Sequence, residues 1–361
     1  MKKRQSIFIV LALAVSFAFV GFQGTAHSGA PYYEGKTITF VVPHSAGGGT
    51  DITARLWAKF LPQFIPGKPT IVVRNMPGGG ASVGGNYVAR SRPDGLTVLI
   101  GSSNTGVGSL LQTSGVDYSY EEMPVFILAS VAEVMVGWTD ITKSHKDFLT
   151  AKNLIFGMEP LPNPSAATWL ILKNAVGFKS KDVLAFQGGA DRALAWFQKE
   201  TNVTWLTSPQ YSRSAKSEVE KGAAVKLMQS GLLNKKGEMV RSEYFSDVPT
   251  AGEVWKSLTG KDPSGIEWDA TLALLGYCRT SNKPALLAKG TPDNILQILR
   301  SAAVKMIADT EYQKASIKVF GGDPQYAGED ARDILNFANS FAKKTRPWLR
   351  KFMQERGGVK F

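Results

Sequence analysis

The chain has 361 residues, a formal net charge of +12 and a single cysteine, Cys278. One cysteine excludes a disulfide within the chain and a thiolate metal cluster, and an apolar content of 43% excludes a wholly disordered chain. The length predicts two domains. The basic charge favours anionic ligands, and because Lys and Arg are scattered along the chain, we expect small anions and no nucleic acid.

The N-terminus has the layout of a secretory signal peptide. Lys2, Lys3 and Arg4 precede an uncharged run over 7–20, and small residues follow at 24–26. The run is shorter than the roughly 20 apolar residues that a spanning helix needs. We therefore predict that residues 1–28 are a signal peptide and that the mature protein is periplasmic and soluble.

The next segment repeats a strand followed by a glycine-rich or polar loop three times, with a helix after the first two loops. In the first helix Ile52, Leu56 and Phe60 share one face at i, i+4 spacing. Strands that alternate with helices indicate an α/β fold with a parallel sheet covered on both faces. The strands are expected at 37–42, 70–73 and 96–100, and the loops at 43–51, 75–82 and 101–106.

The middle of the chain is again β/α in pattern and predicts a second lobe. The apolar run over 125–138 is long enough for one or two strands, and a second apolar run over 266–277 is interpreted as a strand. The tail from Pro292 is predicted to be helical. The remaining elements are expected as strands at 153–157, 183–186 and 203–206, and as helices at 167–175 and 193–199.

In such a sheet, ligands bind outside the carboxyl ends of the strands, where all three loops lie. We therefore expect the loops to converge on one crevice. Gly47, Gly48 and Gly49 let the backbone approach a ligand closely, and their N–H groups, with the positive end of the following helix, suit a carboxylate or phosphate oxygen. Asp51 is expected to cap this helix or to accept a hydrogen bond from the ligand.

Nucleotide binding and catalysis have less support in the sequence. The first loop lacks the lysine of a phosphate-binding loop and the final glycine of the dinucleotide fingerprint. His44 beside Ser45 is the one pair that suggests a hydrolase, but adjacent residues seldom reach hydrogen-bond geometry and no orienting acid can be named. We expect binding without catalysis, with no cofactor and no metal, and keep an exported Ser/His hydrolase as a rival.

Five motifs carry a resemblance to a known family. They are Val41–Asp51 (VVPHSAGGGTD), Asn75–Gly80 (NMPGGG), Arg92–Thr97 (RPDGLT), Asp247–Glu253 (DVPTAGE) and Gly290–Pro292 (GTP). Together they resemble the extracytoplasmic solute-binding receptors of tripartite tricarboxylate transporters, the Bug/TctC-like family. The resemblance covers nearly all of the chain after residue 30 and is densest in the first lobe.

The resemblance implies a two-lobed periplasmic-binding-protein fold of type II-like topology, with the ligand cleft between the lobes. Lobe one would comprise 31–130 plus 271–361, and lobe two 131–270. The ligand would be a small organic carboxylate, and the partners would be the membrane permease subunits that read the closed form. We expect the receptor to be a monomer.

The resemblance also implies the ligand-binding residues. Backbone groups of the first two glycine loops would hold one carboxylate, the third loop would complete that wall, and loops of lobe two would meet the distal part of the ligand. The residues carried over are Ser45, Ala46, Gly47, Gly48, Gly49, Thr50, Asp51, Pro77, Gly78, Gly79, Gly80, Ala81, Ser82, Ser102, Ser103, Asn104, Gln187, Gly188, Gly189, Asp191, Thr207 and Ser208.

The chain departs from the family pattern at the site itself. His44, Ser45 and Ala46 stand where the family usually has an aromatic residue and two prolines, and Met76 takes the place of an arginine. Glu159 facing the ligand would disfavour a second carboxylate unless a cation compensates its charge. A monocarboxylate, an aromatic acid or an amino-containing acid is therefore as compatible as citrate. A binding protein that signals to a membrane receptor would use the same clamp and stays a second alternative.

Overall fold

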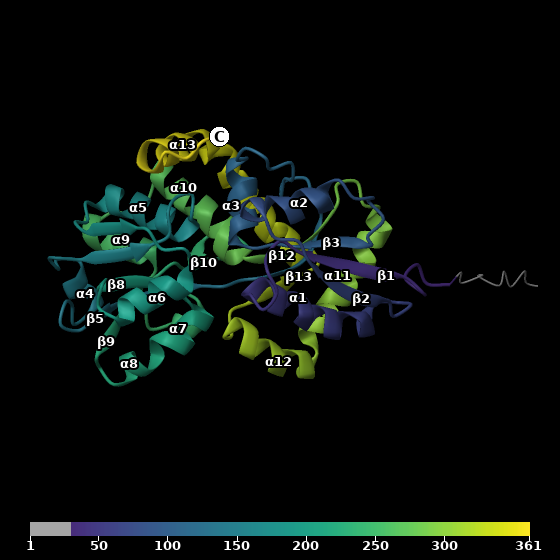
Figure 1. Ribbon diagram of the computed structural model, residues 1–361, viewed down its shortest axis with the longest axis horizontal. Helices are drawn as coiled ribbons and strands as arrows, with labels where there is room; N and C mark the ends of the chain where they lie inside the picture. Colours follow the sequence, from purple (N-terminus) through teal and green to yellow (C-terminus); the bar gives the residue numbers. More distant parts are fainter. Residues whose placement is uncertain (1–29) are drawn as a thin grey trace, which may run out of the picture. The chain divides into compact units, whose positions relative to one another are not determined.

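The computed structural model describes residues 30–361, and Tyr32–Phe361 form one compact unit. The predicted signal peptide, residues 1–28, lies outside the described residues. Two separate sheets with their covering helices give the two-lobed α/β fold that the sequence predicts (Figure 1). None of the helices within residues 30–361 combines the length and the hydropathy needed to cross a bilayer.

The first sheet has six strands in the order β13-β4-β12-β3-β1-β2. Strands β1, β2 and β3 are parallel, as predicted, but β12 enters antiparallel between β3 and β4. The sheet is therefore mixed, because a strand from late in the chain is inserted into it. The strands span Thr37–Val42 (β1), Thr70–Asn75 (β2), Thr97–Ile100 (β3), Val125–Ala129 (β4), Lys283–Leu287 (β12) and Gln325–Ala327 (β13).

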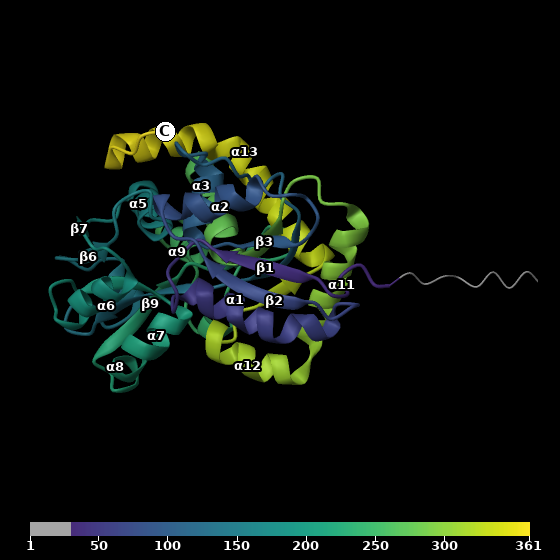
Figure 2. The same ribbon diagram turned by 45° about the vertical axis from the view of Figure 1, so that its right-hand side comes forward.

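Helices cover both faces of this sheet (Figure 2). Successive residues of a strand point to opposite faces, so Phe40 and Val42 of β1 pack with α1, α11 and α12, whereas Val41 packs in a core shared with α2, α3 and α13. The helices span Gly49–Phe60 (α1), Ser82–Ala89 (α2), Ser103–Leu111 (α3), Asp293–Ala308 (α11), Thr310–Phe320 (α12) and Glu329–Gly357 (α13). Short 3₁₀ turns lie at Leu61–Phe64 (η1) and Gly79–Ala81 (η2).

On the predicted face of helix α1, Leu56 and Phe60 are partly buried against the core, but Ile52 is not. Ile52 is 46% exposed, whereas Ala54 and Trp57 are fully buried. The indole Nε1 of Trp57 donates to the hydroxyl of Tyr312 in α12 at 2.8 Å. The buried face is therefore centred on Trp57, which the predicted spacing did not include.

The second sheet has five strands in the order β7-β6-β8-β5-β9. Strands β6, β7 and β8 are parallel, and β5 is antiparallel to β8 and β9. The apolar run over 125–138 forms two strands, β4 and β5, which belong to different sheets, so the chain crosses between the lobes there. The strands span Glu133–Trp138 (β5), Ile155–Met158 (β6), Lys181–Leu184 (β7), Val203–Thr207 (β8) and Ala224–Gln229 (β9).

Short helices and a small hairpin complete the second lobe. The helices span His145–Phe148 (α4), Pro164–Val176 (α5), Gly189–Phe197 (α6), Ser208–Ser214 (α7), Lys216–Glu220 (α8), Ala251–Thr259 (α9) and the 3₁₀ turn Glu243–Phe245 (η3). The hairpin pairs β10 (Leu232–Leu233) with β11 (Met239–Val240). Helix α6 begins four residues earlier than the sequence predicts, with Gly188 as its N-cap.

The strand predicted over 266–277 is wrong. This segment is helix α10 (Ile266–Leu275), followed by a π-helical turn, η4 (Gly276–Thr280). Residues 270–275 are all buried, and a helix buried on every side shows no amphipathic period. A continuous apolar run cannot by itself distinguish a buried strand from a buried helix.

Helix α13 contacts both lobes. Its arginine Arg346 donates from Nε to the carbonyl of Leu110 in α3 at 2.6 Å. Near its C-terminal end Arg356 donates to the Oδ1 atom of Asn174 in α5 at 3.1 Å. One 29-residue helix thus ties a helix of the first lobe to a helix of the second.

Candidate functional site

The first and third predicted loops meet at one hollow beside the carboxyl ends of β1 and β3. This hollow has a volume of about 540 Å³, and we call it the glycine-loop cavity. Eight of the residues carried over from the family resemblance line it, together with His44 and Lys283. Its full lining is His44, Ser45, Ala46, Gly48, Gly49, Thr50, Ser102, Ser103, Asn104 and Lys283.

A buried carboxylate holds the first loop in place. Asp51 is 2% exposed. Its Oδ2 atom accepts from the backbone N–H of Gly47 and from Nε of Arg55, both at 2.9 Å, and its Oδ1 atom accepts from Nδ2 of Asn75 at 2.9 Å. The hydrogen bond from Arg55 leads the causes that lower the pKa of Asp51 to about 2. Asp51 therefore organises the loop with its oxygens already engaged.

His44 bonds across the cavity and not to its sequence neighbour Ser45. Its Nε2 atom lies 2.8 Å from the hydroxyl of Ser102, and its carbonyl accepts from Nδ2 of Asn75 at 3.0 Å. Burial, with the nearby charge of Lys283, lowers the pKa of His44 to about 4. The imidazole is therefore neutral at physiological pH.

The third loop is shorter than predicted, because α3 begins at Ser103. Ser102 is its N-cap: its hydroxyl accepts from the N–H of Thr105 at 3.3 Å, and its own N–H donates to the Thr105 hydroxyl at 2.7 Å. The hydroxyl of Ser103 accepts from Nδ2 of Asn282 at 2.8 Å. Two helix N-termini, those of α1 and α3, thus open onto the same cavity.

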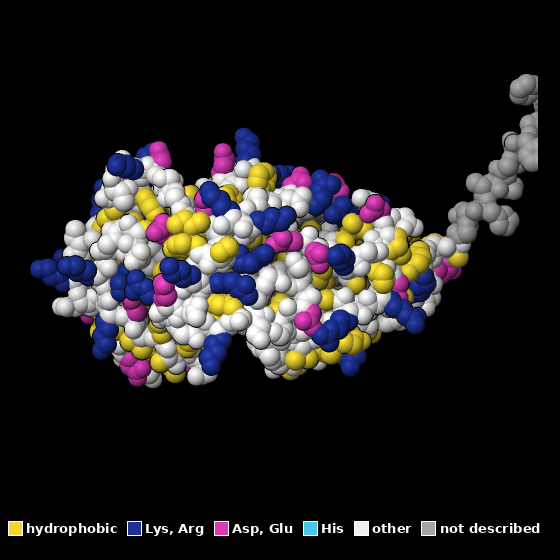
Figure 3. Space-filling view, turned by 90° about the horizontal axis from the view of Figure 1, so that it is seen from above, with side chains coloured by type: hydrophobic (Ala, Val, Ile, Leu, Met, Phe, Trp, Pro, Cys, Tyr) yellow, Lys and Arg dark blue, Asp and Glu magenta, His cyan; other side chains and the backbone are white. Residues whose placement is uncertain are grey.

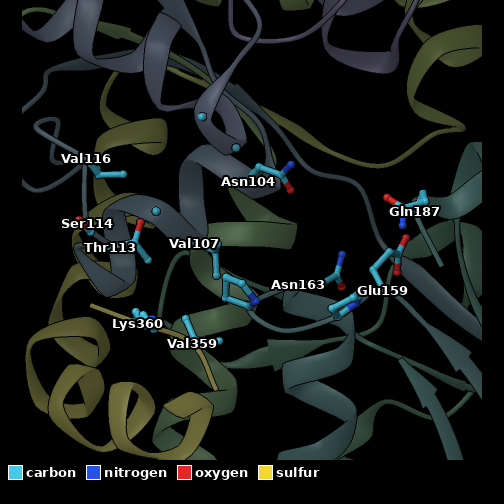
Figure 4. A pocket seen from close by; sticks show the side chains of 15 residues that line it. Asn104, Val107, Thr113, Ser114, Val116, Glu159, Asn163, Gln187, Val359 and Lys360 are labelled. Atoms are coloured by element: carbon cyan, nitrogen blue, oxygen red, sulfur yellow. The ribbon is translucent and has the colours of Figure 1, made fainter. Parts of the chain in front are cut away.

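A second hollow, of about 440 Å³, lies between elements of the two lobes, and we call it the interlobe cavity. Asn104 lines both cavities. In Figure 4 Asn104 and Glu159 come from different walls, and Val359 and Lys360 come from the C-terminal end. Its lining is Gly79, Gly80, Asn104, Val107, Gly108, Thr113, Ser114, Val116, Glu159, Pro160, Pro162, Asn163, Gln187, Val359 and Lys360.

Consecutive glycines shape one wall of the interlobe cavity. Gly78, Gly79 and Gly80 all have positive φ, at 128°, 56° and 64°. Side chains with a Cβ rarely adopt such backbone. A Cβ on Gly79 would also lie 2.3 Å from the hydroxyl oxygen of Ser82. The second loop therefore needs glycine for its backbone course, whether or not a ligand contacts it.

Glu159 lines the interlobe cavity, and a neighbouring cation compensates its negative charge. The guanidinium of Arg192, in α6, forms an ion pair with the Glu159 carboxylate. The Arg192 side chain is 3% exposed and that of Glu159 is 14% exposed. The expected obstacle to a second ligand carboxylate is thereby removed.

A buried ion pair joins the lobes behind the glycine-loop cavity. Arg279, in η4, pairs with Glu133, at the start of β5, at 2.8 Å. The same guanidinium donates to the hydroxyls of Ser165 at 2.6 Å and Ser103 at 3.2 Å. Arg279 therefore links a residue lining the cavity to two residues of the second sheet and its helix.

The other predicted residues lie outside the linings of these two cavities. Gly189 lines a separate hollow between α6 and α7, Thr207 caps α7, and the buried Ser208 donates its hydroxyl to Asp323 at 2.5 Å. The remaining ones are Gly47, Asp51, Pro77, Gly78, Ala81, Ser82, Gly188 and Asp191.

The sequence did not single out Lys283 or Arg192. Lys283 heads an apolar run, Lys283–Leu287, and a charged residue at the edge of a buried strand was the available signal. Arg192 is three residues beyond the Gly188–Gly189 pair and differs in no way from a surface arginine until the fold is known. On the face shown in Figure 3, Lys and Arg are scattered among acidic residues and do not form one patch.

Comparisons with known proteins agree with this architecture. Protein BugT of Bordetella pertussis is 36% identical over 145 residues, which cover 39% of this chain and 44% of that protein, so the match spans less than half of this relative. A UPF0065 protein of the same organism is 25% identical over 312 residues, 82% of this chain and 83% of that protein. No family model matches the chain.

Solved structures share the fold over most of the chain. A TctC solute-binding protein from Polaromonas aligns with a TM-score of 0.63 at 19% identity, covering 86% of this chain and 99% of that one. An R. palustris protein with adipate aligns at 0.60 with 19% identity, over 90% and 98% of the two chains. MatC from Rhodopseudomonas palustris with bound malate aligns at 0.57 with 16% identity, over 88% and 99%.

Proposed function

We infer that this chain is a member of the Bug/TctC-like family of extracytoplasmic solute-binding receptors, and on that premise we propose that it captures a small organic carboxylate. It would act in the periplasm and deliver its ligand to the membrane permease subunits of a tripartite tricarboxylate-type transporter. The relatives and the fold support this role.

The observation that carries the proposal is the glycine-loop cavity. The N-termini of α1 and α3 open onto it through Gly49 and Ser103, and no acidic residue is among the ten described residues that line it. Helix N-termini carry partial positive charge and free N–H groups, which favour anions. The charge of the neighbouring Asp51 is already compensated by Arg55. A carboxylate is the chemical group that this arrangement fits.

The carboxylate class fits what is known of proteins with this fold. One of the aligned structures holds malate and another holds adipate, and both are dicarboxylates. We propose that one carboxylate binds in the glycine-loop cavity and that the rest of the ligand extends past Asn104 into the interlobe cavity. Because Arg192 compensates Glu159, a second carboxylate is compatible with that position.

We propose that the lobes, 31–130 plus 271–361 and 131–270, close on the ligand. All strands of the six-stranded sheet fall in the first set of residues, and all strands of the five-stranded sheet fall in the second. Within this proposal Ser45, Ala46, Gly48 to Thr50, Gly79, Gly80 and Ser102 to Asn104 belong to the first wall, and Gln187 belongs to the second.

A binding screen with a cavity-filling variant tests the proposal. Purified protein would be screened by thermal shift against malate, adipate, citrate, aromatic acids, amino acids and nucleotides. A ligand at a hundredfold excess over its Kd stabilises the protein by about 2.7 kcal/mol. We expect a shift with a carboxylate class, and at least a tenfold weaker Kd in Gly49→Val. A Cβ at Gly49 meets open space, so this variant should fold normally.

The result that contradicts the proposal is equally specific. The carboxylate role would be excluded if only nucleotides shifted the unfolding temperature. It would also be excluded if no organic acid shifted it at millimolar concentration. A Gly49→Val protein that unfolds at the wild-type temperature and binds the same acid equally well would move the ligand away from the glycine-loop cavity.

One contact keeps the hydrolase alternative open to test. The 2.8 Å approach of His44 Nε2 to the Ser102 hydroxyl resembles a base beside a nucleophile. The lowered pKa of His44 makes it a weak base, and the Ser102 hydroxyl also caps α3. Turnover of p-nitrophenyl acetate that is lost in Ser102→Ala would support this alternative, whereas equal background rates in both proteins would remove it.

A further inference from the structure

Lys283 occupies a position that the antiparallel insertion of β12 creates. It is the first residue of β12, and its register partner is Ala129, the last residue of β4. Because β12 runs against β3 and β4, its beginning lies at the edge where those strands end. This edge is the one that carries the glycine loops, so Lys283 reaches the glycine-loop cavity from the sheet.

The Lys283 ammonium has no anionic partner in residues 30–361. No carboxylate of these residues lies within ion-pair distance of it, and its ammonium makes no hydrogen bond with them. The one charged group that shifts its pKa is another cation, Arg279. Burial, followed by repulsion from Arg279, lowers the pKa of Lys283 to about 8.

Lys283 is half-buried, so its ammonium is partly removed from water and would be stabilised by an anion in the cavity. Removing a charge from water without a partner costs free energy, and a nearby opposite charge recovers it. Arg279 cannot supply that charge, and its own partner, Glu133, is already engaged. The other nine residues of the lining are neutral once the imidazole of His44 is counted as uncharged.

We propose that Lys283 is the residue that selects for a carboxylate, by pairing directly with the ligand's carboxylate in the glycine-loop cavity. This inference rests on the proposed function and adds its charged determinant. Backbone N–H groups alone would donate to any hydrogen-bond acceptor, including the oxygen of a neutral amide. An ammonium that lacks a partner discriminates an anion from its neutral isostere.

The test compares charge and shape at position 283. Calorimetric titration with adipate and with its neutral diamide would be run on wild type, Lys283→Met, Lys283→Arg and the control Lys289→Met. Lys289, just beyond β12, pairs with Glu122 on the surface. We expect Lys283→Met to weaken adipate binding about a hundredfold, Lys283→Arg to stay within tenfold of wild type, and the control to be unchanged.

Unfolding of the ligand-free variant separates a binding role from a structural one. If Lys283 is an unpaired cation, replacing it with Met leaves the unfolding temperature equal or raises it, while adipate affinity falls. If the Kd of Lys283→Met for adipate lies within threefold of the wild-type value, the inference is overturned and the proposed function stays intact. Wild type that binds none of the screened organic acids overturns both.

Discussion

The guanidinium of Arg192 forms an ion pair with the carboxylate of Glu159, which is the only acidic side chain among the described residues that line the interlobe cavity. Both side chains are largely buried, and the Nε atom of Arg192 has no hydrogen-bond partner in residues 30–361. The pair decides whether the far wall of the cavity repels a second carboxylate or tolerates it.

Replacing Arg192 with Met leaves Glu159 uncompensated. We expect adipate to bind at least tenfold more weakly, about 1.4 kcal/mol, and the free energy of unfolding to fall by about 1–3 kcal/mol, because a buried charge loses its partner. Calorimetry and urea unfolding measure the two effects. The double variant Arg192→Met/Glu159→Gln should recover most of the affinity, and failure to recover it would mean that Arg192 contacts the ligand itself.

The affinity for a carboxylate should fall above about pH 8. The pKa of free Lys283 is lowered to about 8, and a bound carboxylate raises it again, so binding at higher pH must take up a proton. Neutral His44 and the buried thiol of Cys278, whose pKa is raised to about 12, do not change charge in this range. Affinity should be flat from pH 6.5 to 7.5 and fall by up to about tenfold per pH unit beyond 8. Lys283→Arg should remove this pH dependence. A wild-type affinity that stays constant above pH 8 would contradict the prediction.

His44 should make the protein less stable in mild acid. Its pKa in the folded protein is lowered to about 4, whereas the unfolded chain takes up a proton near 6.5. Between these values the unfolded state binds more protons, so the free energy of unfolding decreases as the pH falls, by at most about 1.4 kcal/mol per pH unit. Urea unfolding measured from pH 7 to 4.5 should show that the free energy of unfolding depends less steeply on pH in His44→Gln than in wild type. Parallel slopes for the two proteins would contradict the assignment.

Breaking the pair between Arg279 and Glu133 should be severe. Both side chains are less than a tenth exposed, and leaving Glu133 alone in this setting costs about 3–5 kcal/mol. Arg279→Met should therefore lower the urea midpoint strongly. The exposed pair of Lys314 and Glu311 offers a matched control, and Lys314→Met should change stability by less than about 1 kcal/mol. Equal effects of the two substitutions would mean that the buried pair contributes little to the joint between the lobes.

Local patterns in the sequence predicted much of the first lobe. The glycine loops follow β1 and β2, and the first and third loops share one cavity because parallel strands end at one edge of a sheet. The strand predicted over 266–277 failed, since residues 270–275 of α10 are all buried and show no amphipathic period. The antiparallel strand β12 depends on a pairing nearly two hundred residues apart, and no local pattern encodes it.

The charged residues of the site were hidden for the same reason. Lys283 reaches the cavity only because β12 is inserted between β3 and β4. Arg192 meets Glu159 only because α6 packs near the loop after β6, thirty-three residues away in the chain. Their roles follow from tertiary contacts, whereas a glycine-rich loop is recognisable from the local sequence alone.

The position of the C-terminus affects how the protein can be handled. Val359 and Lys360 line the interlobe cavity, and the ring of Phe361 lies beneath the guanidinium of Arg350 at 5.0 Å. A purification handle fused after Phe361 would therefore start at the wall of the cavity and compete with its contents. Weak binding measured on such a fusion could be caused by the handle itself. Affinities should therefore be compared on protein without a C-terminal handle.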